Sequence, residues 1–371
     1  MSGERAASAG LAAGGGPGIA VAIAGGGIIG MSIAWRLAQQ GCTVTVFDKG
    51  IIGGEASWAG AGMLAPGGEV EAASRLASLS IESRQLYASF VRELEQASGC
   101  RIDYQECGSL DLAYSLEELE ALEGRASRQA EIGIASKPLS AAQVSTFWPR
   151  VRADDLAGAR FYAGDAVVNP REVVAALIGA SKTLGVELVE TCPVISAVVE
   201  ASGVVLETCR GSRTYQAFVI AAGAWSDSIA IDGVPPLPVA EPVKGHLIGY
   251  SQPEQTCSTI VRHGHTYLLQ RANGLLIAGA SVEHLGFNRD VDPGIVSELA
   301  AAAGFVLPHL QDTTPSKKWI GFRPASDDLH VNSWYSDRLY LAYGHFRNGI
   351  LLAPLTARDL ADQISANLRT R

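Results

Sequence analysis

Short apolar runs separated by glycine-rich turns open the chain and predict alternating strands and helices. Residues 19–24 form a continuous apolar run of strand length, and residues 43–47 form a second one. Between them, residues 31–40 carry apolar side chains at helical spacing, and Gly41 ends that segment. A glycine-rich turn at residues 25–30 joins the first strand to the helix. This order of strand, turn, helix and strand predicts the start of an α/β domain.

Longer periodic segments continue through the rest of the chain. Apolar positions at helical spacing predict helices at residues 74–98, 116–132, 139–147, 171–184, 293–306 and 350–364. Alternating or β-branched runs predict strands at residues 102–105, 109–114, 186–189, 194–199, 204–209, 215–220 and 338–343, with a strand pair or a loop at 158–168. Four more strands, which predict an antiparallel sheet, lie at residues 244–250, 258–261, 265–270 and 275–280. Asn273 and Gly274 predict the turn of the last hairpin in that sheet.

The first glycine turn has the spacing G-x-G-x-x-G of a dinucleotide-binding motif. Gly25 permits a tight turn, Gly27 lets a pyrophosphate approach the backbone, and Gly30 lets the helix pack closely on the strand. The helix that follows offers free N–H groups and a positive dipole end to phosphates. Asp48, at the end of the second strand, can accept hydrogen bonds from ribose hydroxyls, and an acid there argues against the 2′-phosphate of NADP. The alternative is an ordinary tight turn in a chain that contains 41 glycines.

The element order is not a simple series of βα units. The nucleotide-binding element opens the chain, other material intervenes, and βα character returns at residues 170–225. We therefore predict an α/β plus α+β protein in which a second domain interrupts a Rossmann-like nucleotide-binding domain. The nucleotide-binding domain is placed at residues 19–98, 150–232 and 325–371, the antiparallel-sheet substrate domain at 99–149 and 233–324, and a flexible Ala/Gly-rich tail, not a signal peptide, at 1–18.

Composition and charge narrow the possible functions. The chain is 47% hydrophobic and 18% charged, which provides enough apolar material for a large core. Its net charge of −9 argues against nucleic-acid binding, because neutralising phosphates requires clustered Lys and Arg. No uninterrupted apolar run approaches the roughly 18 residues needed for a membrane span. We therefore expect neither a nucleic-acid partner nor a transmembrane helix.

The cysteines show no recognisable pattern. The six are Cys42, Cys100, Cys107, Cys192, Cys209 and Cys257. None has C-x-x-C spacing, and none stands beside a histidine in a zinc-like array. We therefore predict reduced thiols in a cytoplasmic protein, with neither a disulfide nor a metal site.

A run of small residues follows the second strand at residues 53–66. Glycine, alanine and serine dominate it, whereas a packed core needs larger side chains. Small residues allow a backbone to lie against a flat ring system or a phosphate. The alternative is an ordinary flexible loop, because glycine runs are common in loops.

Four separated segments together resemble the D-amino-acid oxidase family of FAD-dependent oxidoreductases, and within it the glycine oxidase branch. They lie at residues 25–31, 53–66, 319–324 and 344–354, with supporting matches at 222–226 and 242–245. The resemblance implies an FAD-binding Rossmann-like domain with an antiparallel substrate sheet. It also implies FAD bound without a covalent link, because no Cys lies at residues 344–354.

The resemblance also assigns residues to the cofactor. The residues expected to hold FAD are Gly25, Gly27, Ile28, Ile29, Gly30, Asp48, Lys49, Ala56, Ser57, Ala61, Gly62, Met63, Val194, Gly223, His345, Phe346, Arg347, Asn348, Gly349, Ile350 and Leu351. Residues 345–351 are expected to wrap the pyrimidine edge of the flavin and to start a helix aimed at it. A helix N-terminus at that edge stabilises the negative charge of reduced flavin.

Further residues are assigned to the substrate. Arg323, Tyr267 and Arg347 are expected to be catalytic, with Arg323 gripping the substrate carboxylate through paired hydrogen bonds. His265, Met63 and Val282 are expected to line the substrate pocket. Each has a structural alternative, which is a surface ion pair for Arg323, a core position for Tyr267 and Met63, and a strand-surface position for His265.

The resemblance implies oxidative deamination of glycine or another small amine, such as sarcosine or a D-amino acid. Hydride transfer to flavin N5 would give an α-keto acid and ammonia, with molecular oxygen reduced to hydrogen peroxide. A role in thiamine biosynthesis and a homo-oligomer, tetrameric in relatives, are also implied. The alternatives are a dehydrogenase that uses a quinone or another acceptor, and a flavin-binding module without turnover.

The chain departs from the family pattern at three places. Residues 325–333 replace an Asp-Gly turn and an apolar stretch, so a contact with the flavin is expected to change. His246 stands where an acid or Gln is common, and Val282 where Met or Leu is usual. These departures bear on the preferred substrate more than on the cofactor.

Overall fold

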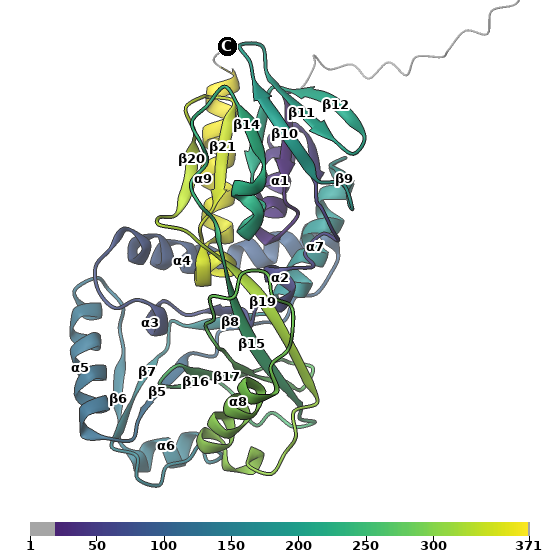
Figure 1. Ribbon diagram of the computed structural model, residues 1–371. Coiled ribbons are helices and arrows are strands. Elements are labelled where there is room, and N and C mark those ends of the chain that lie inside the picture. Colours follow the sequence, from purple (N-terminus) through teal and green to yellow (C-terminus); the bar gives the residue numbers. More distant parts are fainter. Residues whose placement is uncertain (1–18, 370–371) are drawn as a thin grey trace, which may run out of the picture.

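The computed structural model describes residues 19–369, and the predicted flexible tail at residues 1–18 lies outside them. Figure 1 shows two layered regions joined by long strands, with the nucleotide-type elements in one region and the predicted antiparallel sheet in the other. The mixed helix and sheet architecture confirms the predicted fold class. The domain boundaries given above stay a prediction.

A six-stranded sheet carries the dinucleotide motif. Its order is β20 (His330–Ser333), β21 (Leu339–Tyr343), β13 (Ala217–Ile220), β1 (Ala20–Ala24), β2 (Thr43–Phe47) and β9 (Glu187–Val189). All neighbours pair in parallel except β20 and β21. The strand at 217–220 therefore lies inside this sheet and does not close it, because β21 and β20 extend the sheet beyond it.

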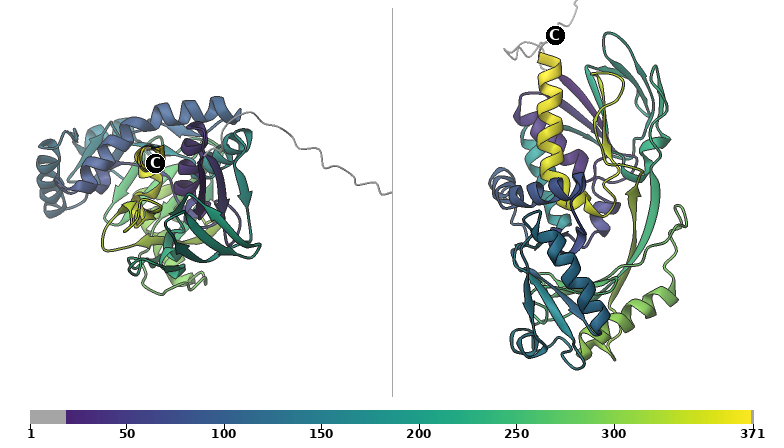
Figure 2. Two further views of the ribbon diagram at one scale, coloured as in Figure 1. Left: turned by 90° about the horizontal axis from the view of Figure 1, so that it is seen from above. Right: turned by 90° about the vertical axis from the view of Figure 1, so that its left-hand side faces the viewer.

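The two faces of the six-stranded sheet are covered differently. Four helices pack on one face, namely α1 (Ile28–Gln39), α4 (Arg75–Ser98), α7 (Pro170–Thr183) and α9 (Gly349–Arg369). A four-stranded sheet packs on the other, in the order β12 (Gly211–Tyr215), β11 (Val204–Thr208), β10 (Val194–Val199) and β14 (Ala230–Asp232). Figure 2 shows α9 in yellow along the helical side and the teal strands on the opposite side.

Alternation along β1 explains this arrangement. Val21 and Ile23 belong to the core shared with the helices, whereas Ala22 and Ala24 belong to the core shared with the four-stranded sheet. Successive side chains of a strand point to opposite faces, so a continuous apolar run is buried on both sides.

A second, eight-stranded sheet forms the other region. Its order is β19 (Lys317–Ala325), β15 (Glu241–Ser251), β18 (Leu275–Gly279), β17 (Thr266–Gln270), β16 (Ile260–His263), β5 (Ser109–Ala113), β7 (Gly158–Tyr162) and β6 (Lys137–Leu139). The pairing is antiparallel except between β16 and β5. Two helices, α5 (Leu116–Ala130) and α6 (Ala141–Phe147), contact strands of this sheet, and α8 (Pro293–Val306) packs on one of its faces.

The small-residue segment lies between the two regions. It contains α2 (Ala56–Ala59) and β3 (Met63–Leu64), and it leads into α3 (Pro66–Glu69). Its alanines pack into a cluster with side chains from the second sheet, among them Leu247, Tyr267 and Trp319. A three-stranded sheet in the order β3, β8 (Ala166–Val168) and β4 (Tyr104–Gln105) continues this connection.

Most predicted elements are present, with small shifts at their ends. The segment predicted as one strand at 215–220 is divided between β12 and β13. Five strands were not predicted, namely β3, β6, β14, β19 and β20, and β20 lies within the segment that departs from the family pattern. Short 3₁₀ turns at η1 (Gly223–Ser228), η2 (Pro308–Leu310) and η3 (Phe346–Asn348) complete the list of elements discussed here.

The prediction that every cysteine is reduced is wrong for one pair. Cys192 and Cys209 form a disulfide, with their Cα atoms 5.5 Å apart. Cys192 precedes β10 and Cys209 follows β11, and these strands pair antiparallel with Val194 opposite Thr208. The register of the hairpin therefore brings together two cysteines that sequence spacing does not relate. The four other cysteines are free.

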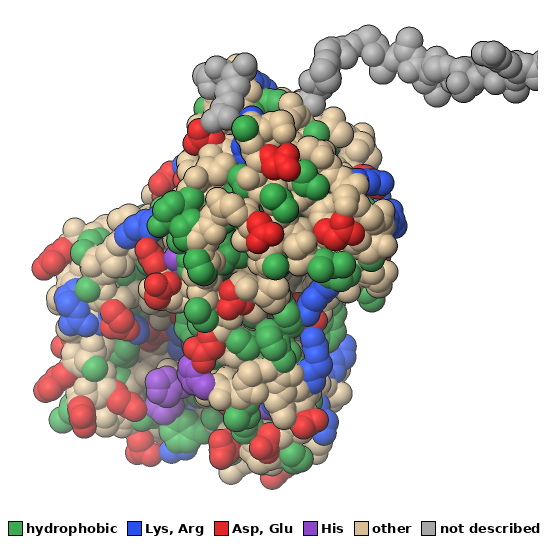
Figure 3. Space-filling model, turned by 45° about the horizontal axis from the view of Figure 1, so that its top comes forward, with side chains coloured by type: hydrophobic (Ala, Val, Ile, Leu, Met, Phe, Trp, Pro, Cys, Tyr) green, Lys and Arg blue, Asp and Glu red, His purple; other side chains and the backbone are tan. Residues whose placement is uncertain are grey.

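The outer surface carries mixed charge. Acidic and basic side chains are interspersed over the face shown in Figure 3. Among residues 19–369, no helix combines the length and the apolar character needed to span a bilayer.

Two side chains of α4 fix the beginning of α9. Pro354 lies inside α9 and has no N–H, so the Ile350 carbonyl, four residues earlier, lacks its helical donor. The Tyr87 hydroxyl donates to that carbonyl at 3.0 Å, and the Ser83 hydroxyl donates to the Leu351 carbonyl at 2.7 Å. Both side chains are fully buried at 0% exposure, so no solvent replaces these bonds.

We predict that Tyr87→Phe lowers the free energy of unfolding by about 1 to 2 kcal/mol, because a buried carbonyl loses its donor. Urea unfolding measures the change. Tyr335→Phe is the matched control, since Tyr335 is 73% exposed, and it should change the value by less than about 0.5 kcal/mol. Equal effects of the two substitutions would contradict this account of α9.

Candidate functional site

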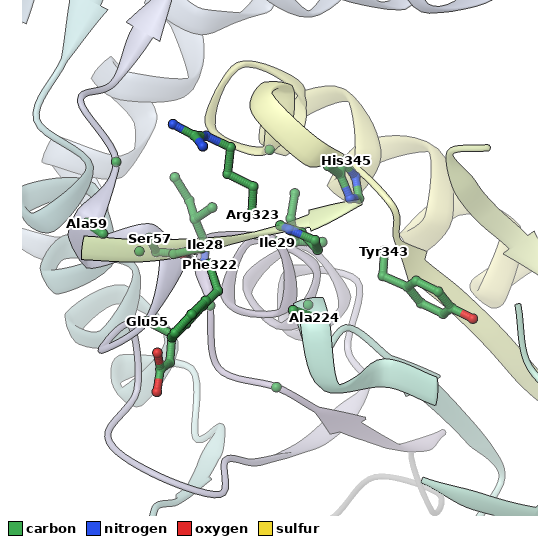
Figure 4. A pocket seen from close by; sticks show the side chains of 18 of the residues that line it. Ile28, Ile29, Glu55, Ser57, Ala59, Ala224, Phe322, Arg323, Tyr343 and His345 are labelled. Atoms are coloured by element: carbon green, nitrogen blue, oxygen red, sulfur yellow. Dashed lines mark hydrogen bonds between the residues drawn. The ribbon is translucent and has the colours of Figure 1, made fainter. Parts of the chain in front are cut away.

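One cavity brings together residues from the N-terminal glycine turn, the small-residue segment, the second sheet and the C-terminal loop (Figure 4). The predicted cofactor residues that line it are Gly25, Gly27, Ile28, Ile29, Asp48, Lys49, Ala56, Ser57, Ala61, Gly62, Met63, Val194, Gly223, His345, Phe346, Arg347, Asn348, Gly349, Ile350 and Leu351. Gly30 is the one predicted cofactor residue that does not line it. Of the predicted substrate residues, Tyr267, Arg323, Arg347 and Met63 line the same cavity.

Two positions of the turn require glycine, because other backbone atoms lie too close there for a side chain. Gly25 has φ +101°, and a side chain there would overlap the Ala221 carbonyl at the end of β13. A side chain at Gly30 would overlap the carbonyl of Gly25. Gly30 therefore acts by letting α1 pack against the turn, and its place outside the cavity lining agrees with that role.

Asp48 holds the loops on both sides of the turn. Its Oδ2 accepts a hydrogen bond from the Gly26 amide and its Oδ1 accepts one from the Gly50 amide, both at 2.8 Å. Burial raises the pKa of this carboxyl, and the two amide donors oppose that rise. A role for Asp48 at a ribose stays a prediction.

The small-residue segment is tied to its neighbours by polar contacts. The Ser57 hydroxyl accepts a hydrogen bond from the Ile28 amide at 2.8 Å, at the N-terminus of α1. Trp319 Nε1 of β19 donates to the Ala59 carbonyl at 2.9 Å. The segment therefore contacts both the nucleotide-type helix and the second sheet.

Arg271 secures the next part of the same segment. Its guanidinium is buried and donates to the carbonyls of Ala61 and Val168. Burial lowers the pKa of Arg271 to about 10, so the group keeps its charge at neutral pH. Gly62 lies between these partners with φ +83°, and a side chain there would overlap the Val168 carbonyl.

Arg323 and Tyr267 meet at the end of the cavity formed by the second sheet. Arg323 projects from the face of β19 opposite to Phe322 (Figure 4). Its Nη1 donates to the Ser281 carbonyl at 3.0 Å, and among residues 19–369 no carboxylate lies within 4.0 Å of the guanidinium. Burial lowers the pKa of Arg323. Burial also raises the pKa of Tyr267, although the nearby Arg323 opposes the rise, so the hydroxyl is protonated at neutral pH.

Arg347 is paired, unlike Arg323. Its Nε and Nη2 atoms lie 3.0 Å and 3.2 Å from the two carboxylate oxygens of Glu69. Glu69 also lines the cavity and was missed in the sequence. Its only signal was an acid that follows the small-residue segment after two glycines, which obscure any periodicity.

Two predicted pocket residues lie elsewhere. His265 is exposed in the turn between β16 and β17, because β17 begins at Thr266, one residue later than predicted, and Gly264 with φ +56° forms the turn before it. Val282 is 51% exposed beyond the end of β18. Neither lines the cavity, so the prediction that they form part of the pocket is not supported by their positions.

The departures from the family pattern also lie away from the cavity. None of residues 325–333 lines it, and β20 pairs with β21 at the edge of the six-stranded sheet. His246 is fully buried, with Nδ1 2.7 Å from Glu283 Oε1 and Nε2 accepting from the Asp292 amide at 2.9 Å. The accepting Nε2 requires the proton on Nδ1, which therefore donates to Glu283.

These features fit FAD. The glycine turn, Asp48 and the N-terminus of α1 provide a cradle for a dinucleotide, and the alanines and glycines of the small-residue segment leave room for a flat ring. The loop at residues 345–351 leads directly into α9, whose N-terminus adjoins the cavity. No group of three or more potential metal ligands occurs among the described residues.

A dinucleotide cradle, a slot lined by small residues and a half-buried arginine without a carboxylate partner are the features expected of a flavin-dependent oxidoreductase. The family model described as FAD dependent oxidoreductase (DAO) matches residues 20–363. This chain therefore belongs to that family of FAD-dependent oxidoreductases.

Individual relatives agree with the family. A glycine oxidase of Geobacillus kaustophilus is 34% identical over 349 residues, which cover 93% of this chain and 92% of that protein. The bifunctional protein ThiO/ThiG of a Nostoc species is 34% identical over 93% of this chain, which spans 52% of that longer protein. The crystal structure of glycine oxidase from Geobacillus kaustophilus superposes with a TM-score of 0.88, at 33% identity over 93% of this chain and 94% of that chain.

His345 provides a test of the electrostatics in this cavity. It is 3% exposed, its Nε2 lies 3.1 Å from the Thr356 hydroxyl, and burial lowers its pKa to about 3. The folded protein therefore binds this proton more weakly than the unfolded chain, and stability is lost as the pH falls below about 6.5.

We predict that His345 accounts for a loss of about 2 kcal/mol in the free energy of unfolding between pH 7 and pH 5. In His345→Gln this part of the pH dependence should disappear in urea unfolding. His265→Gln, which removes an exposed imidazole, is the matched control. The assignment is contradicted if His345→Gln keeps the wild-type slope.

Proposed function

We propose that this protein is an FAD-dependent amino-acid oxidase that deaminates glycine or another small amino acid or amine. The observation that carries the proposal is Arg323, a half-buried cation that lines the cofactor cavity and has no carboxylate within 4.0 Å among the described residues. A partly desolvated charge is costly without a partner, so the missing anion is expected to come from the substrate. The names of the glycine oxidase relatives support glycine as the amino acid.

Arg323 would hold the substrate carboxylate through two parallel hydrogen bonds, which fix both position and orientation. The protonated Tyr267 hydroxyl would donate to the same carboxylate and complete its hydrogen bonding. Together they would direct the α-carbon and its amine towards the small-residue segment, away from bulk water. The contribution of the protein is therefore to orient the substrate in a largely apolar cavity.

Bound FAD would supply the two-electron chemistry, with N5 as the hydride acceptor and oxygen as the final oxidant. The balanced reaction converts glycine, water and oxygen into glyoxylate, ammonia and hydrogen peroxide. The substrate ammonium would first lose a proton to solvent, hydride would then leave the α-carbon as its nitrogen forms a double bond to that carbon, and water would hydrolyse this bond. None of these steps requires a nucleophilic side chain, and we assign none.

Further properties belong to the same proposal. Non-covalent FAD binding is supported by the absence of cysteine among the cavity-lining residues. The ThiO/ThiG relatives support a role in thiamine biosynthesis. The family resemblance alone supports a homo-oligomer, with a tetramer expected. A cytoplasmic location is proposed from composition, although the Cys192–Cys209 disulfide is more typical of oxidising compartments.

Glycine should bleach the flavin absorption of the purified protein under argon, and admission of air should restore it and produce hydrogen peroxide. We predict that Arg323→Lys lowers kcat/KM for glycine by at least about 100-fold, mainly through KM, because an ammonium cannot replace the planar fork. Steady-state peroxide production measures the effect.

Arg150→Lys is the matched control, because Arg150 is an exposed arginine paired with Glu254, and neither residue lines the cavity. It should leave kcat/KM unchanged. Reduction under argon without reoxidation by air would indicate a dehydrogenase with another acceptor. Absence of reduction by any amine would contradict the proposal and favour a flavin-binding module.

A further inference from the structure

The substrate end of the cavity contains two guanidinium groups in different electrostatic situations. Arg323 has carbonyl partners only, with Ser281 at 3.0 Å. Arg347 forms a two-pronged ion pair with Glu69, at 3.0 Å and 3.2 Å. The charges of Arg323, Arg347 and Glu69 all shift the pKa of Tyr267. The three charged groups therefore surround the same part of the cavity. Within the described residues, this end of the cavity therefore offers one unpaired cation and one neutralised cation.

Glu69 is held in place by buried groups beneath it. The Gly67 amide donates to Asp165 Oδ1 at 3.0 Å, and Asp165 is 2% exposed. Gly68 lies directly against the Arg262 guanidinium, where any side chain would overlap the charged group. Arg262 is itself paired with Asp111 at 2.6 Å. The backbone of α3 therefore has little freedom to carry Glu69 away from the cavity.

The side chains of the ion pair remain accessible from the cavity. Glu69 is 19% exposed and Arg347 is 32% exposed, and both line the cavity together with Arg323. A ligand bound to Arg323 can therefore extend towards the pair. A second carboxylate on that ligand would meet the negative charge of Glu69 and would have to displace it from Arg347.

We propose that Glu69 is a specificity-determining residue that excludes substrates with a second anionic group by keeping Arg347 paired. This inference rests on the proposed function only in assigning a carboxylate to Arg323. Selectivity of this kind arises from a repulsive element placed against the wrong ligand, in addition to attraction for the right one. The substrate class is therefore monocarboxylate amino acids, and N-carboxymethyl or other dicarboxylate amines are rejected.

A binding experiment tests the inference without turnover. FAD-loaded protein is titrated with acetate and with malonate, and the flavin absorption spectrum gives Kd for each. Wild-type protein should prefer acetate. In Glu69→Gln the ratio of the two Kd values should shift towards malonate by at least about fivefold, because Arg347 becomes available and the repulsion is lost.

Three variants make the interpretation specific. Glu71→Gln removes a negative charge two residues away, from an exposed side chain outside the cavity lining, and should keep the wild-type ratio. Glu69→Gln combined with Arg347→Met should lose the gain for malonate. Arg347→Met alone leaves Glu69 charged and should shift the ratio further towards acetate, which tests the inference even if Glu69→Gln does not load FAD.

Kinetics extend the same test to the reaction. Iminodiacetate carries two carboxylates on one amine, and Glu69→Gln should lower its KM relative to that of glycine, with the change in KM exceeding the change in kcat. The inference is overturned if the ratio of the Kd values for acetate and malonate shifts by less than about fivefold in Glu69→Gln. It is also overturned if Glu71→Gln shifts that ratio equally. If the ratio shifts as expected and no amine reduces the flavin, the proposed function fails and the assignment of Glu69 stands.

Discussion

The close packing of the small-residue segment between two sheets is the constraint on which the rest of the site depends. Its alanines pack against Leu247, Tyr267 and Trp319 of the second sheet, and Ser57 bonds to the N-terminus of α1. Larger side chains at these positions would separate the sheets and break the cavity into parts. Because the side chains of the segment are small, the nucleotide cradle and Arg323 of β19 line one continuous cavity.

Charge is distributed in this space so that one cation remains for a ligand. Arg271 is satisfied by backbone carbonyls, and Arg347 is satisfied by Glu69. His345 is neutral because burial lowers its pKa to about 3. Arg323 is half-buried, lines the cavity and has no carboxylate within 4.0 Å in the described part of the chain, whereas Arg271 does not line the cavity. A carboxylate ligand would therefore complete the electrostatics of the cavity.

Local sequence patterns predicted most of the fold and the cofactor end of the site. The features that were missed depend on pairings between residues far apart in the sequence. Gly25, Gly30 and Asp48 could be recognised because the motif, its strand and its helix are contiguous in sequence. The strand β19 was missed because its partner β15 lies about 70 residues away and its own residues do not alternate. Glu69 was missed because its partner Arg347 lies 278 residues away. The Cys192–Cys209 disulfide was missed because it depends on the register of the β10–β11 hairpin. His265 was wrongly placed in the pocket because the turn at Gly264 includes it.

The central claim is that FAD and a substrate carboxylate occupy one cavity, with Arg323 as the carboxylate partner. A crystal structure of the protein with FAD and acetate tests it most directly. The account predicts the flavin ring against the small-residue segment and both carboxylate oxygens within about 3.2 Å of the Arg323 guanidinium. Acetate bound elsewhere, or a flavin ring that lies outside the space between the two sheets, would contradict it.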